Sequence, residues 1–512
     1  MEVRPPEGAN LSRGRLKKRL HPSVISHITE PYLTAALRHL EHHYYVHEAH
    51  VVMLQEQRLL DAESSATLLK GLARLRAGEL TATPLDPETD LYMNLESRLI
   101  GLTGDVGGMM HIGRSRNDLY ATVTRMAVRD ELLQTLELLL QLIDSMLRVA
   151  EQHKATTMTG YTHWQHAQPV TVAHYLTGIT QSLLRDADRL KAAYAHTNLC
   201  PMGAAALSGT GFPIDRERVS NLLGFSEVLE NTYDAVAARD FVAEAAAALA
   251  VSMVTLSRVA EDLIIWSTQE FAMVDIPEDF AITSSIMPQK KNPFVLEHIK
   301  GRAGHVIAAL TGVLTILKGT SFSHSREVGG ESGAGILNAF SLCHGSLSMM
   351  SHLLPSLGFN AALMERRASE SFCTVTDLVD LIVRKKGIPF RTAHQIVAQI
   401  VNTVQQQGMS VDAISTALIS QIARRITGSE LTLPESDLRE ALNANRNVAA
   451  REVKGGPGPA ALTDMISRQH AYHRDHRTWL AEQRSALAGA RAASATAADS
   501  LVNAAKPSSV PQ

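Results

Sequence analysis

Apolar residues recur at helical spacing along most of the chain. The longest such stretch runs from Glu131 to about Gln152 and is apolar on nearly every side. A helix that is apolar all round is buried nearly all round. A single domain of this size rarely buries a helix so completely, so the pattern predicts the centre of an oligomeric bundle. Similar patterns predict four more long helices, at Thr171 to about His196, Asp234 to about Phe271, Asn292 to about Leu317 and Gly335 to about Leu357.

Shorter helical patterns flank these five. They run from Ser23 to about Leu80 and from Asp90 to Leu99, and they resume after about Ser369 with glycine and proline breaks. No strand-length alternation competes with them. Since 512 residues are too many for one compact core, we predict an all-α fold of three domains. The predicted domains are 1–118, 119–368 and 369–488.

The two ends of the chain differ from the rest. Residues 1 to about 20 are polar and basic, which predicts an extended arm. A helix is predicted from Ala460 to about Leu487. From Gly489 onward the sequence is rich in alanine and serine, so we predict a disordered tail over 489–512.

Composition excludes several classes of partner. The formal net charge is only -3, and no long basic run suggests nucleic acid. The chain has 3 cysteines, far apart and without metal-ligand spacing, which suits a reducing cytoplasm. Its start lacks the apolar core of a signal peptide. The most apolar stretch, Ala245 to Leu256, is too short to span a bilayer. We therefore predict a cytoplasmic protein that binds neither membrane nor nucleic acid.

The loop from Thr283 to Pro293 interrupts two helical patterns and concentrates polar groups. Ser284, Ser285, Lys290 and Asn292 bring hydroxyl, ammonium and amide donors into one short segment. Those are the donors that a carboxylate substrate needs. A serine N-cap followed by a proline turn explains an isolated Ser-Ser-x-x-Pro run equally well.

Two further loops carry candidate chemistry. The first holds Ser115, Arg116 and Asn117, although a capped helix start explains it as well. The second runs from Gly160 to His174 and contains Thr162, His163 and Gln168. Its three histidines lack the spacing of a zinc site, and a lone histidine is more often structural.

Together the three loops supply cations and hydrogen-bond donors without a phosphate-binding loop, a nucleotide fingerprint or a metal-ligand set. This combination predicts work on a small, multiply anionic substrate, with no cofactor and no metal.

At these residues the sequence resembles the argininosuccinate lyase and fumarase/aspartase superfamily. Ser284 to Asn292 fits the Ser-Ser-x-Met-Pro-x-Lys-x-Asn signature of that superfamily. Gly113 to Asp118, and Gly160 to His163 with Ala167 to Pro169, fit two further blocks typical of argininosuccinate lyase-like members. The resemblance covers about residues 35 to 455.

The resemblance implies a helical homotetramer whose active site combines the three blocks from three subunits. It also implies an elimination that releases fumarate from a succinyl group. In that scheme Ser284 is the base, supported by Lys290 and loop amides, and His163 orients the substrate or helps to protonate the leaving nitrogen. The carboxylates of the substrate are held by a larger set, namely Ser115, Arg116, Asn117, Thr162, Gln168, Ser285 and Asn292.

Departures from the argininosuccinate lyase pattern fall in the half of the site that handles the leaving amine. Leu119 stands where those lyases have glutamine, and Tyr92 stands where they have histidine. In the segment Ser321 to Glu331, Phe322, Glu327 and Gly330 replace tyrosine, glutamine and lysine. We therefore predict a leaving-group pocket that includes Tyr92, Leu119, Arg326 and Glu327.

These departures favour a lyase acting on another N-substituted aspartate, similar to ethylenediamine-disuccinate lyase. A site that loses its hydrogen-bonding partners discriminates strongly, by as much as about 10⁴-fold. Argininosuccinate lyase proper is the alternative if the alignment of Ser321 to Glu331 is shifted. A non-catalytic relative, like the lens crystallins of this family, is disfavoured because the predicted catalytic residues are intact. The sequence indicates the reaction class and leaves the amine, the direction and the pathway open.

Overall fold

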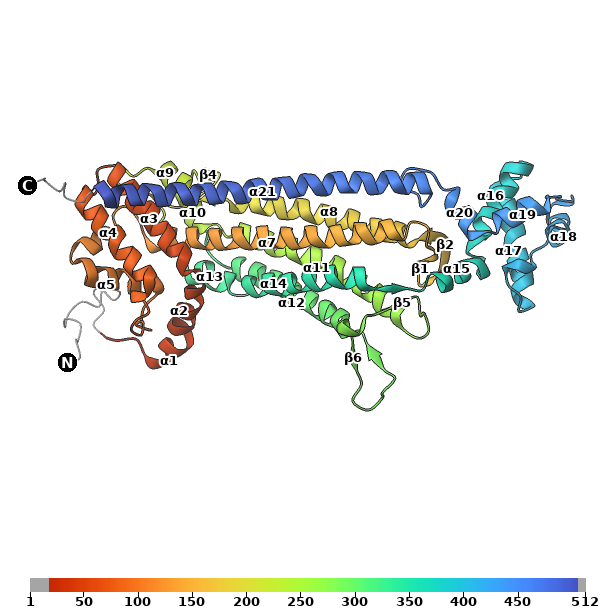
Figure 1. The fold of residues 1–512 in the computed structure, drawn as a ribbon, viewed down its shortest axis with the longest axis horizontal. Helices are drawn as coiled ribbons and strands as arrows, with labels where there is room; N and C mark the ends of the chain where they lie inside the picture. The colour runs from red at the N-terminus through yellow and green to blue at the C-terminus, as the bar shows by residue number, and fades with distance from the viewer. Residues whose placement is uncertain (1–17, 505–512) are drawn as a thin grey trace, which may run out of the picture.

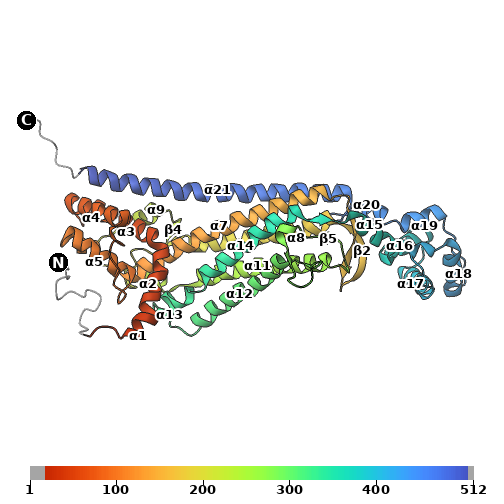
Figure 2. The same cartoon turned by 60° about the horizontal axis from the view of Figure 1, so that its bottom comes forward.

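The computed structural model describes residues 18–504, which form a long helical rod (Figure 1). Five long helices run along the rod and pack on one another, and a second view shows the same arrangement (Figure 2). They are α7 (Arg116–Gln152), α8 (Val172–Thr197), α11 (Asp240–Ser267), α12 (Phe294–Leu317) and α14 (Ile336–Ser356). The prediction of an all-α fold with five long central helices is confirmed.

The helix α7 is the longest member of this group and begins earlier than the apolar pattern indicated. It has 37 residues and starts at Arg116 rather than near Glu131. A capping box explains the early start: Ser115 caps the first amides, and Asp118 accepts the backbone amide of Ser115. The apolar residues further along α7, such as Leu139 and Ile143, are fully buried in the main core.

The N-terminal helices form a separate core at one end of the rod (Figure 1). They are α1 (Pro22–Val24), α2 (Glu30–Ala36), α3 (Leu40–Glu56), α4 (Ala62–Arg74), α5 (Leu91–Thr103) and α6 (Val106–Met109). Short helices from the middle of the chain lie beyond α8: α9 (Arg216–Leu222), α10 (Thr232–Ala237) and α13 (Arg326–Gly329). The predicted extended arm falls mostly outside the described residues, since these begin at residue 18.

A third core lies at the opposite end of the rod (Figure 1). The helices at this end are α15 (Ala361–Glu370), α16 (Val375–Lys386), α17 (Phe390–Gln406), α18 (Thr416–Thr427), α19 (Glu435–Ala441) and α20 (Ala444–Ala449), and the third core is built from α16 to α19. The amphipathic pairs α16–α17 and α17–α18 pack on each other and enclose residues such as Ile396 and Ile422.

The last helix, α21 (Pro459–Ala504), corrects the prediction of a tail that is disordered from Gly489. It runs back along α7 and α8 to the N-terminal end (Figure 1). Alanine is the strongest helix former, and its small side chain lets helices approach closely. Leu501 and Val502 pack against the N-terminal core, so the alanine-rich stretch is ordered by contact. Residues 505–512 of the predicted tail lie outside the described residues.

The position of α21 also changes the assignment of residues 459–488. They were placed with the C-terminal domain, but Leu462, Ile466 and Leu480 belong to the core of the central bundle. The third core contains residues from 378 to 442 and none from α21. The predicted boundary follows the order of the sequence, whereas α21 leaves the third core and runs back along the central bundle.

Short strands occur where none was predicted. β1 (Thr157–Thr162) and β2 (Gln165–Thr171) form an antiparallel hairpin. The remaining strands are two-residue pairs: β3 (Leu199–Cys200) with β4 (Glu227–Val228), β5 (Val274–Asp275) with β8 (Gly358–Phe359), and β6 (Ile282–Thr283) with β7 (Lys291–Asn292). The hairpin escaped notice because its outer half is polar and exposed, which blurs the period of two.

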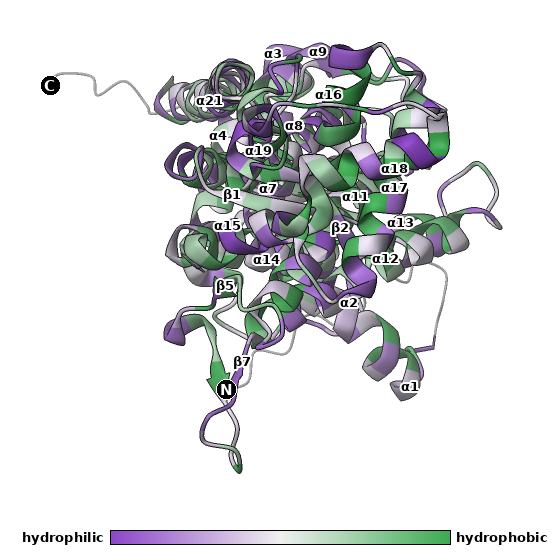
Figure 3. Ribbon diagram, turned by 90° about the vertical axis from the view of Figure 1, so that its right-hand side faces the viewer, coloured by the Kyte–Doolittle hydropathy of each residue, from purple (hydrophilic) through white to green (hydrophobic). Residues whose placement is uncertain are grey.

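One side of the bundle exposes apolar residues. In the end-on view α12 and α21 lie on opposite sides of the bundle (Figure 3). On α11 and α12, four large apolar side chains are at least 41% exposed: Val251, Val254, Ile307 and Leu314. We call these four residues the α11–α12 face. α11 is long and apolar enough to cross a bilayer, but 56% of its most apolar window is buried in the bundle. Packing within the bundle therefore explains the apolar character of the part of this window that is buried.

Candidate active site

One buried carboxylate organises the turn that precedes α7. Asp118 Oδ1 accepts the amide of Ser115 at 2.9 Å, and Oδ2 accepts the amides of Gly203 and Ala205 at 3.0 and 2.9 Å. Burial raises the pKa of Asp118 to about 6, although these amide donors act to lower it. Ser115 Oγ in turn accepts the amide of Asn117 at 3.3 Å. The carboxylate therefore ties the start of α7 to the loop at 203–205 and fixes the path of residues 115–117.

Arg116 and Asn117 line a cavity of about 270 Å³ at this end of the rod. Arg116 Nη1 donates to Asp90 Oδ2 at 2.7 Å, and Asn117 Nδ2 donates to the carbonyl of Ala206 at 3.1 Å. The rest of the wall consists of Tyr120 on α7 and three residues around the start of α13, namely His324, Ser325 and Arg326.

Two wall residues of this cavity are held neutral at pH 7. Burial, together with the nearby charges of Arg239 and Arg326, lowers the pKa of His324 to about 4. Burial and the carboxylate of Asp90 raise the pKa of Tyr120 well above its usual value. Since Arg116 is already paired with Asp90, the cavity presents the Arg326 guanidinium among neutral polar groups. Such a wall suits a ligand that carries an anionic group.

Thr162 and His163 lie at the tip of the β1–β2 hairpin. Thr162 pairs with Gln165, so the turn itself consists of His163 and Trp164. Their φ angles are 54° and 60°, in the left-handed region that two-residue hairpins require and that glycine or asparagine normally fills. Holding bulky residues there costs on the order of 1–3 kcal/mol each, and such strain concentrates at functional sites. The turn is therefore a candidate for function on backbone geometry as well.

The base of the hairpin is anchored to the C-terminal helices. Gln168 Nε2 donates to Thr376 Oγ1 at 3.3 Å. Arg451 Nη1 donates to the carbonyl of Pro169 at 2.9 Å, and the same guanidinium pairs with Asp377. Gln168, which was predicted to bind substrate, thus fixes the hairpin on α16 in this structure.

The loop between β6 and β7 projects from the flank of the bundle (Figure 1). Ser284 Oγ accepts two backbone amides, from Ile286 at 3.3 Å and Met287 at 3.1 Å. Ser285 and Lys290 are exposed, and Asn292 is half-buried within β7. Ile286, at the tip of the loop, is 81% exposed.

One chain does not bring the three loops together. At 1.5 Å per residue, the 37 residues of α7 span about 55 Å. The turn with Ser115 precedes the start of α7, and the hairpin with His163 follows its end (Figure 1). The Ser284 loop projects from the flank between them. Of the predicted site residues, Arg116, Asn117 and Arg326 line a common cavity.

Three predicted leaving-group residues do not line that cavity. Tyr92 and Leu119 are each 1% exposed and belong to the N-terminal core, while Glu327 is exposed on α13. Tyr92 instead donates its hydroxyl to Glu96 Oε1 at 2.5 Å and lies 2.7 Å from His111 Nδ1. The resemblance pointed to these positions from their residue types alone, which do not show which side of a helix each residue occupies.

Four cavity residues were not predicted: Asp90, Tyr120, His324 and Ser325. Helical geometry gives a signal for one of them, because Tyr120 is four residues after Arg116 and so shares its face of α7. Asp90 is the N-cap of α5 and accepts the amide of Met93 at 2.9 Å. An aspartate before an apolar helix is a common cap. The sequence therefore gave no sign that its other carboxylate oxygen pairs with Arg116.

A layer of buried histidines lies behind the Ser115 turn. Arg114 Nη1 donates to His47 Nδ1 at 2.9 Å, and His50 Nε2 donates to the carbonyl of Ile112 at 2.9 Å. Burial lowers the pKa of His43 to about 3 and that of His111 to about 4, and it lowers those of His47 and His50 strongly. These histidines are neutral at pH 7 and pack beside a guanidinium. Within residues 18–504 no three histidine, cysteine or acidic side chains are grouped to hold a metal ion.

A rod of five long helices with polar loops at its two ends and flank defines the class of fumarase-like and aspartase-like lyases. Two family models match this chain. The lyase model covers residues 45–308, and the argininosuccinate lyase C-terminal model covers residues 372–449.

Individual relatives agree with these matches. Argininosuccinate lyase 1 of Shouchella clausii is 38% identical over 460 residues, which cover 89% of this chain and 92% of that protein. The argininosuccinate lyase of Methanosarcina acetivorans is 40% identical over 425 residues, covering 82% and 85%. The crystal structure of EDDS lyase in complex with formate has a TM-score of 0.87 at 37% identity, covering 95% of this chain and 97% of that one.

The chain belongs to the argininosuccinate lyase-like subgroup of the fumarase/aspartase superfamily. It is a carbon–nitrogen lyase that releases fumarate. A fumarate lyase from Mesorhizobium, at 19% identity and a TM-score of 0.68, shares the fold.

The buried histidine layer predicts loss of stability on acidification. Each histidine is held neutral in the folded protein and titrates near 6.5 when unfolded, so the unfolded state binds more protons below that pH. The free energy of unfolding keeps the whole contribution of these histidines above pH about 6.5. It falls as the pH is lowered toward about 4, by about 1.4 kcal/mol per pH unit for each such histidine.

Chemical denaturation between pH 7.5 and 5 at fixed protein concentration measures this slope. His43→Gln is expected to flatten it by the contribution of one proton, whereas the same change at the exposed His27 leaves it unaltered. An identical slope in the His43 variant would contradict the prediction.

Proposed function

We propose that the protein catalyses the reversible elimination of fumarate from an N-substituted aspartate, with Ser284 as the base. The observation that carries this proposal is the position of Ser284 Oγ, which accepts the amides of both Ile286 and Met287. A serine hydroxyl is a poor base at its ordinary pKa. Two amide donors aimed at the oxygen would stabilise its alkoxide.

The chemistry requires such support on the substrate as well. Removal of the Cβ proton places a second negative charge on the adjacent carboxylate and gives an aci-carboxylate. The C–N bond then breaks, the electron pair leaves with nitrogen, and fumarate is formed. Lys290 and Asn292 would hold the carboxylate that takes up the charge, and Ser285 would bind next to the base. Preorganised donors of this kind commonly make the largest contribution to catalysis.

The cavity beside α7 suits the other end of the substrate. Arg116 and Asn117 reach it from the first turn of α7, which Ser115 caps. Arg116 is held by Asp90 at 2.7 Å, so its guanidinium is oriented before substrate arrives. These groups would bind the carboxylate of the succinyl part that is not deprotonated.

The leaving nitrogen needs a proton, and the hairpin offers the group to deliver it. His163 stands at a strained turn and is exposed, next to Thr162. Thr162 would hydrogen-bond a carboxylate while His163 orients the substrate or passes a proton to nitrogen. Gln168 would act indirectly, by holding the hairpin in place through its hydrogen bond to Thr376.

The length of α7 argues for a site shared between subunits. Loops about 55 Å apart in one chain can meet only if several chains assemble. In a homotetramer with helices packed side by side, the α11–α12 face would be the buried contact, because it exposes four large apolar side chains. The exposed Ile286 would then lie against a neighbouring subunit.

The amine distinguishes two candidate functions. The EDDS lyase structure favours an aminocarboxylate or diamine leaving group, and the 38–40% identity to argininosuccinate lyases favours arginine. The changes at Phe322, Glu327 and Gly330 support the former, because argininosuccinate lyases have tyrosine, glutamine and lysine at those positions. We therefore rank another N-substituted aspartate first.

A panel of amines tests the substrate class. The protein is incubated with fumarate and diamines, amino acids, hydrazines or arginine, and the loss of fumarate absorbance is followed. We expect addition to at least one amine other than arginine, at a rate well above that with arginine. Turnover of argininosuccinate faster than every other adduct would instead identify the second candidate.

Two substitutions of Ser284 separate a base from a cap. Ser284→Ala removes both functions, whereas Ser284→Asn keeps a side-chain oxygen that can accept the amides of Ile286 and Met287. If the hydroxyl is the base, both variants lose activity by about 10²–10⁴-fold. Steady-state kinetics on the best adduct measures kcat. Retention of activity in the Asn variant would show that the oxygen serves only to shape the loop.

Subunit mixing tests the shared site. Ser284→Ala and Arg116→Ala proteins are each expected to be inactive. After joint unfolding and refolding, about a quarter of sites combine an intact loop from one subunit with an intact α7 start from another. Activity should return to about that fraction of wild type. A mixture as inactive as its components would place both residues of a site on the same chain.

A further inference from the structure

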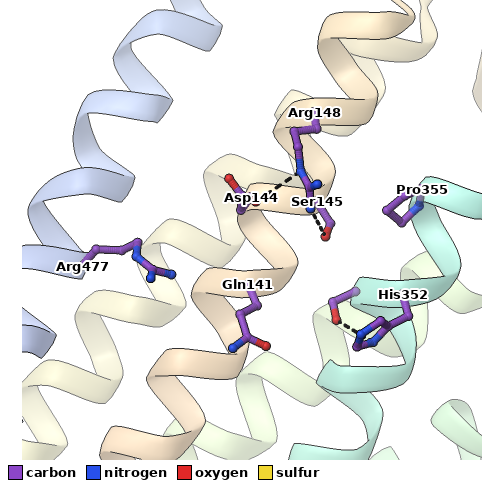
Figure 4. A pocket seen from close by; sticks show the side chains of 8 residues that line it. Gln141, Asp144, Ser145, Arg148, His352, Pro355 and Arg477 are labelled. Carbon is purple, nitrogen blue, oxygen red and sulfur yellow. Dashed lines mark hydrogen bonds and ion pairs between the residues drawn. The ribbon is translucent and has the colours of Figure 1, made fainter.

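A second cavity lies on the opposite stretch of the rod, between α7, α14 and α21 (Figure 4). Its volume is about 370 Å³. Its lining comes from three helices: Gln141, Asp144, Ser145 and Arg148 on α7, Ser351, His352 and Pro355 on α14, and Arg477 on α21. None of the residues assigned to the three catalytic loops lines it.

The two arginines of this cavity are placed differently. Arg148 Nε pairs with Asp144 Oδ2 at 3.2 Å, and its Nη2 donates to Ser145 Oγ at 3.3 Å. Asp144 therefore already has a cationic partner on the wall of the cavity. Arg477 extends from α21 toward α7 (Figure 4), and within residues 18–504 it makes no hydrogen bond or ion pair.

A second acidic residue of α7, Glu137, does not pair with Arg477. Glu137 lies one helical turn before Gln141, and its Oε2 accepts from Arg484 at 2.7 Å. Arg484 lowers the pKa of Glu137 most strongly, and the charge of Arg477 lowers it to a smaller extent. Two guanidinium groups and one paired carboxylate leave the cavity with a net positive charge.

Further polar groups complete the lining. Ser351 Oγ and His352 Nδ1 both donate to the carbonyl of Ser348, at 2.8 and 2.7 Å, which fixes their orientation. The side-chain amide of Gln141 is left to donate to a ligand. A guanidinium fork with adjacent polar groups matches the oxygens of phosphate or of a carboxylate.

We propose that this cavity binds a small multivalent anion, either inorganic phosphate or a dicarboxylate, with Arg477 as the principal ligand. The volume accommodates such an ion with some water. The bound anion joins α21 to α7 and α14, three helices from distant parts of the chain. Because it binds the folded protein and not the unfolded chain, it raises the thermal midpoint.

Calorimetric titration of the assembled protein with phosphate and, separately, malonate at constant ionic strength tests the proposal. We expect saturable binding of at least one anion and a rise in the melting temperature. Arg477→Gln should weaken binding by at least roughly tenfold, since it removes the unpaired guanidinium. Arg474→Gln, an exposed arginine one turn away on α21, is the matched control and should bind as wild type does. The tighter of the two anions identifies the ligand class.

Two further variants separate this cavity from the catalytic one. Arg477→Gln should keep its elimination activity in anion-free buffer, whereas Arg116→Ala should keep the anion response. Binding that survives in Arg477→Gln but disappears in Arg116→Ala would overturn the proposal by placing the anion in the catalytic cavity. The absence of saturable binding in the wild-type protein would overturn it as well. Neither result bears on whether Ser284 is the base.

Discussion

The length of α7 constrains the rest of this molecule. A helix of 37 residues cannot bend its two ends together, so the polar groups at Ser115 and at His163 stay about 55 Å apart in any single chain. Each end of the rod has its own hydrophobic core, and the long helices connect the two cores. The proposed site, which combines both groups, therefore requires more than one copy of the chain. The exposed apolar residues on α11 and α12, and the exposed Ile286, agree with that requirement.

The groups at the start of α7 are positioned by buried polar interactions. Asp118 collects amides from two segments, and Arg114 is held against neutral histidines of α3. Buried polar groups that are paired specify one arrangement strongly, since any other arrangement leaves them without partners. The turn that carries Arg116 and Asn117 therefore inherits its geometry from the N-terminal core. Substitutions in the N-terminal core are therefore expected to alter the shape of the cavity even where the substituted residue does not line it.

The sequence predicted the long helices well because their apolar pattern is set by the same burial that stabilises them. It also predicted the superfamily, since the three polar blocks are local in sequence. The β1–β2 turn was not predicted, although Thr162 and His163 were, because His163 and Trp164 adopt φ values that their side chains disfavour. The tail was misjudged because alanine-rich composition suits both a disordered segment and a docked helix, and only the partner surface decides between them. Leu119 and Tyr120 show the same limit: of these adjacent residues, Leu119 is buried in the core, whereas Tyr120 packs against that core and also lines the cavity.

The arrangement separates the parts of the reaction that are common to the superfamily from those that differ. Ser284 and its amide donors sit on a loop that makes few contacts with the bundle, whereas Tyr120, His324 and Arg326 come from the far end of the rod. Within one chain these two groups share no contact, so substitutions in the wall leave the loop that would carry the base intact. The neutral state of His324 follows from burial beside Arg326 and Arg239, and therefore from the packing of α13 on the bundle. A change of amine would thus require only that α13 and its neighbours repack around a new leaving group, while the chemistry at the succinyl end continues with the same residues.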